Sequence, residues 1–348
     1  MTKDKPPSKK PPKTPIKSVQ YDLFTTFLTN DEGAVSNAIE LWDGIPKYFL
    51  TPKQQDKLRT PEGLAKPFEW SYIYQGKPFS VSIQPALIKQ EDGGYKAFFP
   101  SMTEELVEEA LKKIFTDQQY GFHDPGNAES WVTFTLSMLY SELKKQGRER
   151  NRDQIKHAIA VLSGCILTLY RDGKEIYKGP ILSDLMTVNR KEYLADSNSH
   201  HAARLPVFIS HSINRLEYRQ FNFARLMDCD RQLTRWLYKR LVHRYRHASL
   251  MDTYHFLFSD VQQGSGLLQQ GTDRHNRSKL VSALGELKEK GVLLSYTVEE
   301  LKDGRKVVNI KYTVTAAPEF IREQKAANKR ERDNLHKAHT LRLVDKSE

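Results

Sequence analysis

A spacing of apolar residues that occurs twice, 125 residues apart, constrains the fold of this chain more than any other feature of the sequence. Each set has the i, i+3, i+4, i+7 order that places apolar side chains on one face of an α-helix. The two sets are Ile155, Ala158, Ile159 and Leu162, and then Leu280, Ala283, Leu284 and Leu287. The repeat therefore predicts two copies of one helical unit.

The same kinds of element surround both helices. A strand-like run and a shorter helix precede each one, at 131–135 and 136–146 in the first copy and at 254–258 and 259–270 in the second. A β-hairpin follows each one, turned at 171–173 and at 302–305 by residues that include Asp-Gly. Strand, helix, turn, helix and hairpin form a winged helix. The sequence thus predicts an α+β fold with two tandem winged-helix domains.

Composition changes along the chain predict four segments. Residues 1–17 hold six lysines and five prolines, which predicts a disordered basic arm. Residues 18–194 comprise an N-terminal β-containing extension and the first winged helix. The polar tract that starts at Ala195 is the expected junction, so 195–328 form the second winged helix and 329–348 a charged tail that is solvated or frayed.

The start of the second repeated helix is the main candidate for reading DNA. Its first turns carry six polar or cationic side chains, Arg274, His275, Asn276, Arg277, Ser278 and Lys279. Because such a helix presents its N-terminal residues to base edges in the major groove, Arg274 or Arg277 is expected to read guanine and Asn276 adenine. At the tip of the hairpin, Lys302, Arg305 and Lys306 are expected to hold phosphates.

Two further sets of residues are weaker candidates. Arg152, Gln154 and Lys156 on the first repeated helix are expected to make accessory DNA contacts, although that helix has fewer donors and its alternative role is protein contact. A helix at 231–247, capped by Asp230, carries Arg235 on a face that is expected to touch the DNA backbone. An amphipathic helix followed by a hairpin also occurs in α+β domains that bind no nucleic acid, and only the repeat favours DNA binding.

The charge and the cysteine content restrict the class of protein. Lys and Arg number 54 against 43 Asp and Glu, which gives a net charge of +11 and favours a polyanionic partner. Only two cysteines are present, and the sequence shows no secretory leader and no apolar run that would cross a bilayer. The expected location is the cytoplasm, and no membrane partner is expected.

No pattern in the sequence predicts catalysis, a cofactor or a metal. His243 and His247 are four residues apart on a helix, but no third ligand and no catalytic Glu accompany them. A Gly-rich phosphate loop of the G-x-x-x-x-G-K-[ST] type is missing, which excludes a P-loop NTPase or helicase. We therefore expect a binding protein and not an enzyme.

The order of several segments resembles the plasmid replication initiators of the two-winged-helix Rep family. The segments that carry the resemblance are AIELWDGIPKYF, GGYKAFFPSMTEELVEEALKKIF, VTFTLSMLYSEL, QIKHAIAVLSGCIL, LTRWLYKRLVHRY and NRSKLVSALGELKEKGVL. The resemblance covers about residues 21–320 and implies that the second winged helix binds double-stranded DNA at repeated origin sequences called iterons. It also implies that the first winged helix mediates dimerisation, with monomers acting on iterons.

The same resemblance implies further partners and roles. It implies origin opening, contact with the replicative helicase and the initiator of the host, and repression of the protein's own promoter. A winged-helix transcriptional regulator with no role in initiation has the same DNA-binding features and is the alternative. A protein that binds single strands or RNA would need exposed aromatic residues, and the presumed reading face of the second helix has none.

Overall fold

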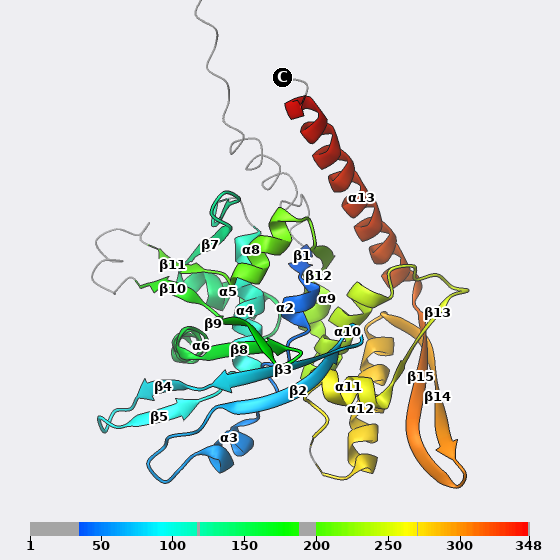
Figure 1. Cartoon of the computed structure of the whole chain (residues 1–348), viewed down its shortest axis with the longest axis horizontal. Helices are drawn as coiled ribbons and strands as arrows, with labels where there is room; N and C mark the ends of the chain where they lie inside the picture. The colour runs from blue at the N-terminus through cyan, green and yellow to red at the C-terminus, as the bar shows by residue number, and fades with distance from the viewer. Residues whose placement is uncertain (1–34, 117–118, 188–199, 270, 347–348) are drawn as a thin grey trace, which may run out of the picture.

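The computed structural model describes residues 35–116, 119–187, 200–269 and 271–346, with side chains as far as residue 337. The expected basic arm at 1–17 lies outside these residues. The described chain has an α+β fold in which small antiparallel sheets surround a helical centre, and a long C-terminal helix extends from the body (Figure 1).

The second winged helix has the predicted order of elements. Its elements are α10 (Gln232–Arg244), β13 (Thr253–Leu257), α11 (Phe258–Ser265), α12 (Asp273–Glu289), β14 (Leu293–Asp303) and β15 (Lys306–Ala316). The three strands form one antiparallel sheet in the order β13-β15-β14, so the strand before α11 closes onto the hairpin that follows α12. The predicted winged helix is confirmed in this half of the chain.

The first copy has the same order of elements but a different strand pairing. Its elements are α4 (Met102–Phe115), β6 (Gly121–Asp124), β7 (Glu129–Phe134), α5 (Leu136–Lys145), α6 (Arg152–Gly164), β8 (Ile166–Arg171) and β9 (Lys174–Pro180). The hairpin β8–β9 pairs with β3 from the N-terminal region, and not with β7. Its turn is of the predicted kind, because Asp172 and Gly173 have φ of 51° and 75°, as a two-residue hairpin turn of type I′ requires.

The N-terminal extension is built into the first winged helix. Its elements are β1 (Val35–Ala38), α2 (Glu40–Asp43), α3 (Pro52–Leu58), β2 (Phe68–Tyr74), β3 (Lys77–Gln84), β4 (Ala86–Lys89) and β5 (Tyr95–Phe98). Strands β2 and β3 extend the hairpin of the first winged helix into a sheet of order β2-β3-β8-β9. The expected β-containing element is therefore present, but it is not a separate unit.

The segment between the two copies corrects the expected junction at Ala195. It contains β10 (Ser183–Met186), β11 (His201–Arg204), α8 (Val207–Asn214), β12 (Arg219–Asn222) and α9 (Phe223–Asp228). Residues 200–204 had the composition of a polar linker, yet β11 pairs with β7 of the first copy, and Ala203 is fully buried opposite Val132. Residues 195–199 lie outside the described part of the chain. Strand β12 pairs with β1, so the two halves share sheet structure and a continuous core.

The C-terminal segment also differs from the predicted solvated or frayed tail. Helix α13 spans Pro318–Lys346 without a break at residue 328, and it projects from the body as the red helix in Figure 1. Beyond the expected boundary, Glu331 still forms ion pairs with Arg219 and Arg246, each at 3.1 Å. The charge-rich sequence thus continues as a helix that is held to the body at Glu331.

The apolar faces predicted from the repeat are buried. All eight residues of the two sets are at most 7% exposed, and those of α12 are completely buried. At roughly 1.5–3 kcal/mol for each large aliphatic side chain removed from water, these faces account for much of the attachment of α6 and α12.

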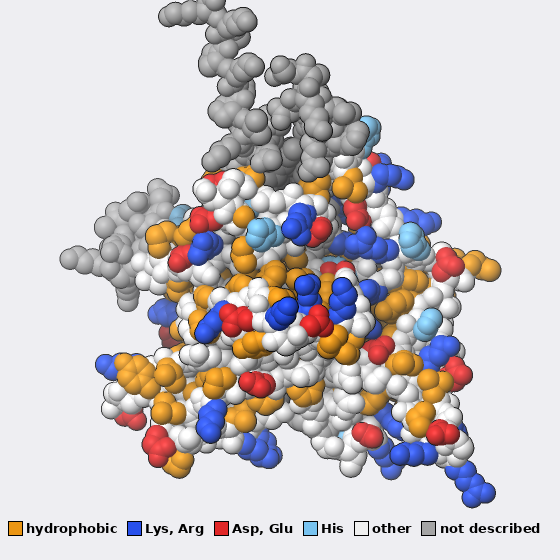
Figure 2. Space-filling view, in the orientation of Figure 1, with side chains coloured by type: hydrophobic (Ala, Val, Ile, Leu, Met, Phe, Trp, Pro, Cys, Tyr) orange, Lys and Arg blue, Asp and Glu red, His pale blue; other side chains and the backbone are white. Residues whose placement is uncertain are grey.

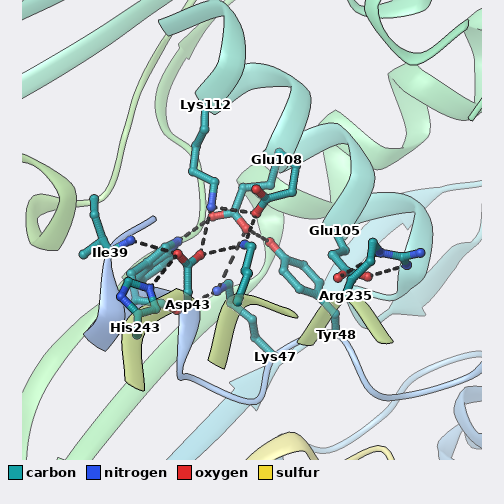
Figure 3. Close-up of polar contacts among 12 residues, drawn as sticks. Ile39, Asp43, Lys47, Tyr48, Glu105, Glu108, Lys112, Arg235 and His243 are labelled. Atoms are coloured by element: carbon teal, nitrogen blue, oxygen red, sulfur yellow. Dashed lines mark hydrogen bonds and ion pairs between the residues drawn. The ribbon is translucent and has the colours of Figure 1, made fainter. Parts of the chain in front are cut away.

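A network of buried charges joins α10 to α2 and α4 (Figure 3). The Asp43 carboxylate accepts hydrogen bonds from Lys112 Nζ and Lys239 Nζ, each at 2.9 Å, and Lys112 also reaches Glu109 at 2.6 Å. Glu108 accepts hydrogen bonds from the indole of Trp42 and, at 2.6 Å, from the hydroxyl of Tyr48. The network connects the N-terminal extension, the first winged helix and the second.

Burial and ion pairing have opposite effects on the titration of this network. Burial alone would raise the pKa of Asp43, but the neighbouring Lys112 and Lys239 hold that pKa well below its usual range. Burial would lower the pKa of Lys112, and the carboxylates of Asp43 and Glu109 instead raise it well above its usual range. Both groups are therefore charged at neutral pH.

We predict that Asp43→Asn lowers the free energy of unfolding by about 3–5 kcal/mol, because the two buried ammonium groups of Lys112 and Lys239 then share Glu109 as their remaining ion-pair partner. Chemical denaturation of the full chain measures this change. Asp333→Asn, on the exposed face of α13, is the matched control and should leave stability within about 0.5 kcal/mol of the parent.

The acid dependence of stability follows from the direction of the Asp43 shift. A carboxyl whose folded pKa is lowered contributes stability above its ordinary pKa of 3.8 and loses it as pH falls through the folded value. The difference in the free energy of unfolding between the parent and Asp43→Asn should therefore become smaller as the pH falls below about 3.8. A gap that stays constant with pH would contradict a charged Asp43.

Candidate nucleic-acid interface

Local sequence fixes both ends of α12. The hydroxyl of Thr272 caps the helix by accepting a hydrogen bond from the backbone amide of His275 at 3.4 Å. At the other end Gly291 has a φ of +68°, and the amide of Val292 donates to the carbonyl of Leu287 at 2.9 Å. Gly291 therefore ends the helix.

The carboxylate of Glu286 fastens α12 to the start of α10. Glu286 is 4% exposed and accepts hydrogen bonds from Thr234 Oγ1 at 2.6 Å, from Arg231 Nη1 at 2.9 Å and from the backbone amide of Asp230. An anion at the N-terminal end of a helix is also favoured by the helix dipole. The reading helix is thus held at a fixed angle against α10.

The surface of α12 is open along one side. Arg274, His275, Ser278 and Ser282 are exposed there, and a Cβ placed on Gly285 would meet no heavy atom within 4 Å. Since small and cationic groups dominate this side, a duplex could approach the helix backbone closely. These residues lie where the sequence predicted the reading face.

Two of the predicted reading residues do not lie on that open side. Asn276 is 3% exposed, and its buried Oδ1 atom has no hydrogen-bond partner in the described part of the chain, so the predicted contact with adenine is wrong for this arrangement. Asn276 lies four residues before Leu280, so helical spacing places it on the buried face of α12. Arg277 is half-buried beside Tyr312 of β15. Burial raises the pKa of the Tyr312 hydroxyl, and the positive charge of Arg277 partly offsets that rise. Lys279 is half-buried as well.

The hairpin β14–β15 extends beside α12 and carries the predicted wing residues at its tip. Lys302, Arg305 and Lys306 are all exposed, and Gly304 has a φ of +60° in the two-residue turn. Lys302 is paired with Glu300 at 3.1 Å, whereas Arg305 and Lys306 have no carboxylate within 4 Å among the described residues. Figure 2 shows Lys and Arg side chains gathered over the tip of this hairpin, at the lower right.

The first copy presents a narrower surface. Arg152, Gln154 and Lys156 are exposed at the start of α6, but Gln154 is engaged in a capping box with Asn151, and Lys156 lies 3.7 Å from Asp153. The hairpin β4–β5 covers another side of this helix, where the rings of Phe98 and His157 are 4.5 Å apart. Whether these three residues contact DNA stays a prediction.

Arg235 does not lie on a DNA-facing surface. It is 1% exposed, and its guanidinium pairs with Glu105 at 2.8 Å and donates to the carbonyl of Cys229 at 3.0 Å. The predicted contact with the DNA backbone is therefore wrong, because α10 is packed between the two halves of the protein. The predicted cap also differs, since α10 begins after Arg231, and Asp230 instead pairs with Arg148 at 2.8 Å.

Sequence reasoning missed the residues that position the reading helix. The sequence predicted no role for Glu286 or for the acids of α4. A signal for Glu286 was present, because it falls between Ala283 and Leu287 on the apolar side of the helix. A carboxylate at such a position needs a buried partner.

No group of three or more His, Cys, Asp or Glu side chains among the described residues is placed to hold a metal ion. None of the helices in that part of the chain has both the length and the apolar character needed to span a bilayer.

The fold and this surface define a protein with two winged-helix units, of which the second presents an open helix and a cationic wing. No family model and no curated protein matches the chain. Solved structures do match at the level of the fold. They include two crystal structures of domains 2 and 3 of RctB and a crystal structure of Pi initiator protein in complex with iteron DNA.

The extent of these likenesses is as follows. One RctB structure has 13% identity and a TM-score of 0.46, covering 78% of this chain and 97% of the other. The selenomethionine RctB structure has 13% identity and a TM-score of 0.45, covering 75% and 95%. The Pi structure has 12% identity and a TM-score of 0.37, covering 83% and 100%.

We predict that Glu286→Gln lowers the free energy of unfolding by about 1.5–3 kcal/mol, because hydrogen bonds to a charged acceptor are lost in a buried site. Hydrogen exchange of the α12 amides should become faster, which is a sensitive measure of a loosened helix. Glu289→Gln, exposed on the same helix, is the control. Equal exchange in both variants would show that Glu286 does not hold α12.

Proposed function

We propose that this protein initiates replication by binding repeated origin sequences in double-stranded DNA through α12 and the β14–β15 wing. One observation carries the DNA-binding part of the proposal. The open side of α12 and the wing tip belong to one module that is fixed by buried contacts, and Arg274, Arg305 and Lys306 form no ion pair with any residue that the structure describes.

The dimensions of the module suit a duplex. The 17 residues of α12 correspond to a helix of about 25 Å, and a helix of this kind fits the major groove with its first turns toward the bases. A hairpin beside the helix then lies along the flanking phosphates. Arg274 is the residue best placed to read a base, since it is exposed in the first turn, while the wing supplies attraction to phosphates that is independent of sequence.

The part of the proposal that concerns initiation is supported by the resemblance of the sequence to two-winged-helix initiators. In this proposal several protomers bind adjacent direct repeats and bend the origin, which costs on the order of 1–6 kcal/mol for a site of 20–30 base pairs. The contacts of the bound protomers offset that cost and promote opening of the neighbouring duplex. Recruitment of the host helicase, contact with the host initiator, a repressing dimer and activity of the monomer on iterons belong to the same proposal.

A transcriptional regulator with no role in initiation is the second candidate. The open face of α12 and the wing favour it equally, since both functions need a duplex-reading winged helix. Unlike an initiator, a transcriptional regulator needs no further activity at the origin after it has bound.

For the DNA-binding part, we predict that Arg274→Ala reduces affinity for the cognate repeat by about 1–3 kcal/mol and relaxes the preference at one base position. Lys306→Ala should weaken binding to cognate and random DNA alike and reduce the salt dependence. Lys288→Ala, exposed at the far end of α12, serves as a control with little effect. Fluorescence anisotropy at several salt concentrations measures all three. Equal losses on both DNAs for Arg274→Ala would contradict its role as a base reader.

For initiation, we predict that the gene supplied in trans restores replication of a plasmid that carries its origin repeats but lacks the gene. The Arg274→Ala variant should restore it poorly, and Lys288→Ala should restore it fully. Repression of a reporter promoter without any replication in trans would favour the transcriptional regulator.

A further inference from the structure

A cavity lies between α10, α11 and the turn that joins β2 to β3. It has a volume of about 720 Å³ and lies between the N-terminal extension and the second winged helix, away from the open side of α12. Small-molecule sites commonly have volumes of about 300–1,000 Å³ and occur where two structural units meet. The size and position therefore suit a small organic ligand.

One side of α10 forms a wall with both aromatic and cationic groups. Trp236, Arg240 and His243 lie three to four residues apart, so all three face the cavity. The guanidinium carbon of Arg240 is 5.4 Å from the centroid of the Trp236 ring, and that of Arg244 is 6.0 Å from the centroid of Tyr74 on β2. A planar ring can insert between such surfaces through stacking and cation–π attraction.

Two nitrogen atoms at this wall have no hydrogen-bond partner among the described residues. One is Nε2 of His243, which is 7% exposed and lies 4.0 Å from Asp43 Oδ2. The other is the buried Nε of Arg240, whose Nη2 lies 3.9 Å from the half-exposed carboxylate of Asp260. Since an unsatisfied buried donor is costly, the Nε–H of Arg240, and Nε2 of His243 when it is protonated, favour a ligand that offers acceptor oxygens.

The charges around the cavity limit the charge of that ligand. Lys239 is neutralised by Asp43 and Glu109, and Arg244 lies 2.7 Å from Glu40. Arg240 is thus the cation with the weakest counter-ion, while Asp260 and Glu40 would repel a large negative charge. One phosphate fits this balance better than a triphosphate.

We propose that this cavity binds a nucleotide, with the base between the Trp236 and Tyr74 side chains and a single phosphate on Arg240 and His243. This goes beyond the proposed function, because the duplex-reading surface plays no part in it. The same chemistry is offered by a free nucleoside monophosphate and by one residue of a single DNA strand. A bound nucleotide bridges α10 and β2 and stabilises the packing of the second winged helix against the extension.

Calorimetric titration of the full chain with AMP, and separately with a short oligothymidylate, tests the proposal. Arg240→Leu should weaken binding by about tenfold or more, because a charge-assisted hydrogen bond is lost. Trp236→Leu should weaken it through the loss of stacking. Arg215→Leu, an exposed arginine with no ion pair within 4 Å in the described structure, is the matched control. Retained binding to duplex DNA and an unchanged thermal transition show that each variant is folded.

The outcomes separate the two sources of the nucleotide. Binding of AMP that depends on Arg240 but not on Arg215 supports a free nucleotide. The same dependence for the oligonucleotide alone supports a nucleotide within a strand. No binding of either probe, or binding that Arg240→Leu leaves unchanged, would overturn the proposal. Duplex binding by the same variants is an independent readout, so failure here does not affect the proposed function.

Discussion

The buried pairing of Asp43 with Lys112 and Lys239 is the interaction on which the arrangement of this protein depends. It joins α2, α4 and α10, which come from the N-terminal extension and from both winged helices. Ionised groups in a core are tolerated only when each has partners, so the network specifies one relative position of the three helices. The salt bridge between Arg235 and Glu105 adds a second connection between α10 and α4.

Contacts with α10 also fix the position of the reading helix, α12. Glu286 anchors α12 to the first residues of α10, and the apolar face of α12 fills the core behind it. The wing continues directly from the glycine stop at Gly291. A change in the buried charges of α10 would thus alter the position of the open side of α12, although no charged residue of the network lies there.

How far the sequence predicted the structure depended on how local each feature is. The apolar spacing in α6 and α12 and the two Asp-Gly turns are set by neighbouring residues, and each was predicted correctly. Strand pairing is set by residues far apart, which is why β11 was mistaken for a linker and the hairpin β8–β9 was not expected to join β3. Charge in the sequence also did not distinguish a DNA-facing arginine from Arg235, whose partner Glu105 is 130 residues away.

The candidate site was predicted in outline but not in each side chain. The first turn of a helix and the tip of a hairpin follow from the sequence, and both are exposed where expected. Which residues of that turn face outward depends on how α12 packs, and Asn276 lies on the buried face of α12 while Arg277 is half-buried beside β15. The position of Glu286 shows that a carboxylate on an apolar face indicates a tertiary contact.

The central claim is that the open side of α12 faces the duplex. A DNA-cleaving iron chelate attached at Ser278→Cys tests it directly, because the two native cysteines, Cys165 and Cys229, are buried and will not take the label. We predict cleavage confined to the bound repeats, and no cleavage when the chelate is attached at Asp333→Cys on α13. Equal cleavage from both positions, or none from Ser278→Cys while the protein is bound, would contradict the account.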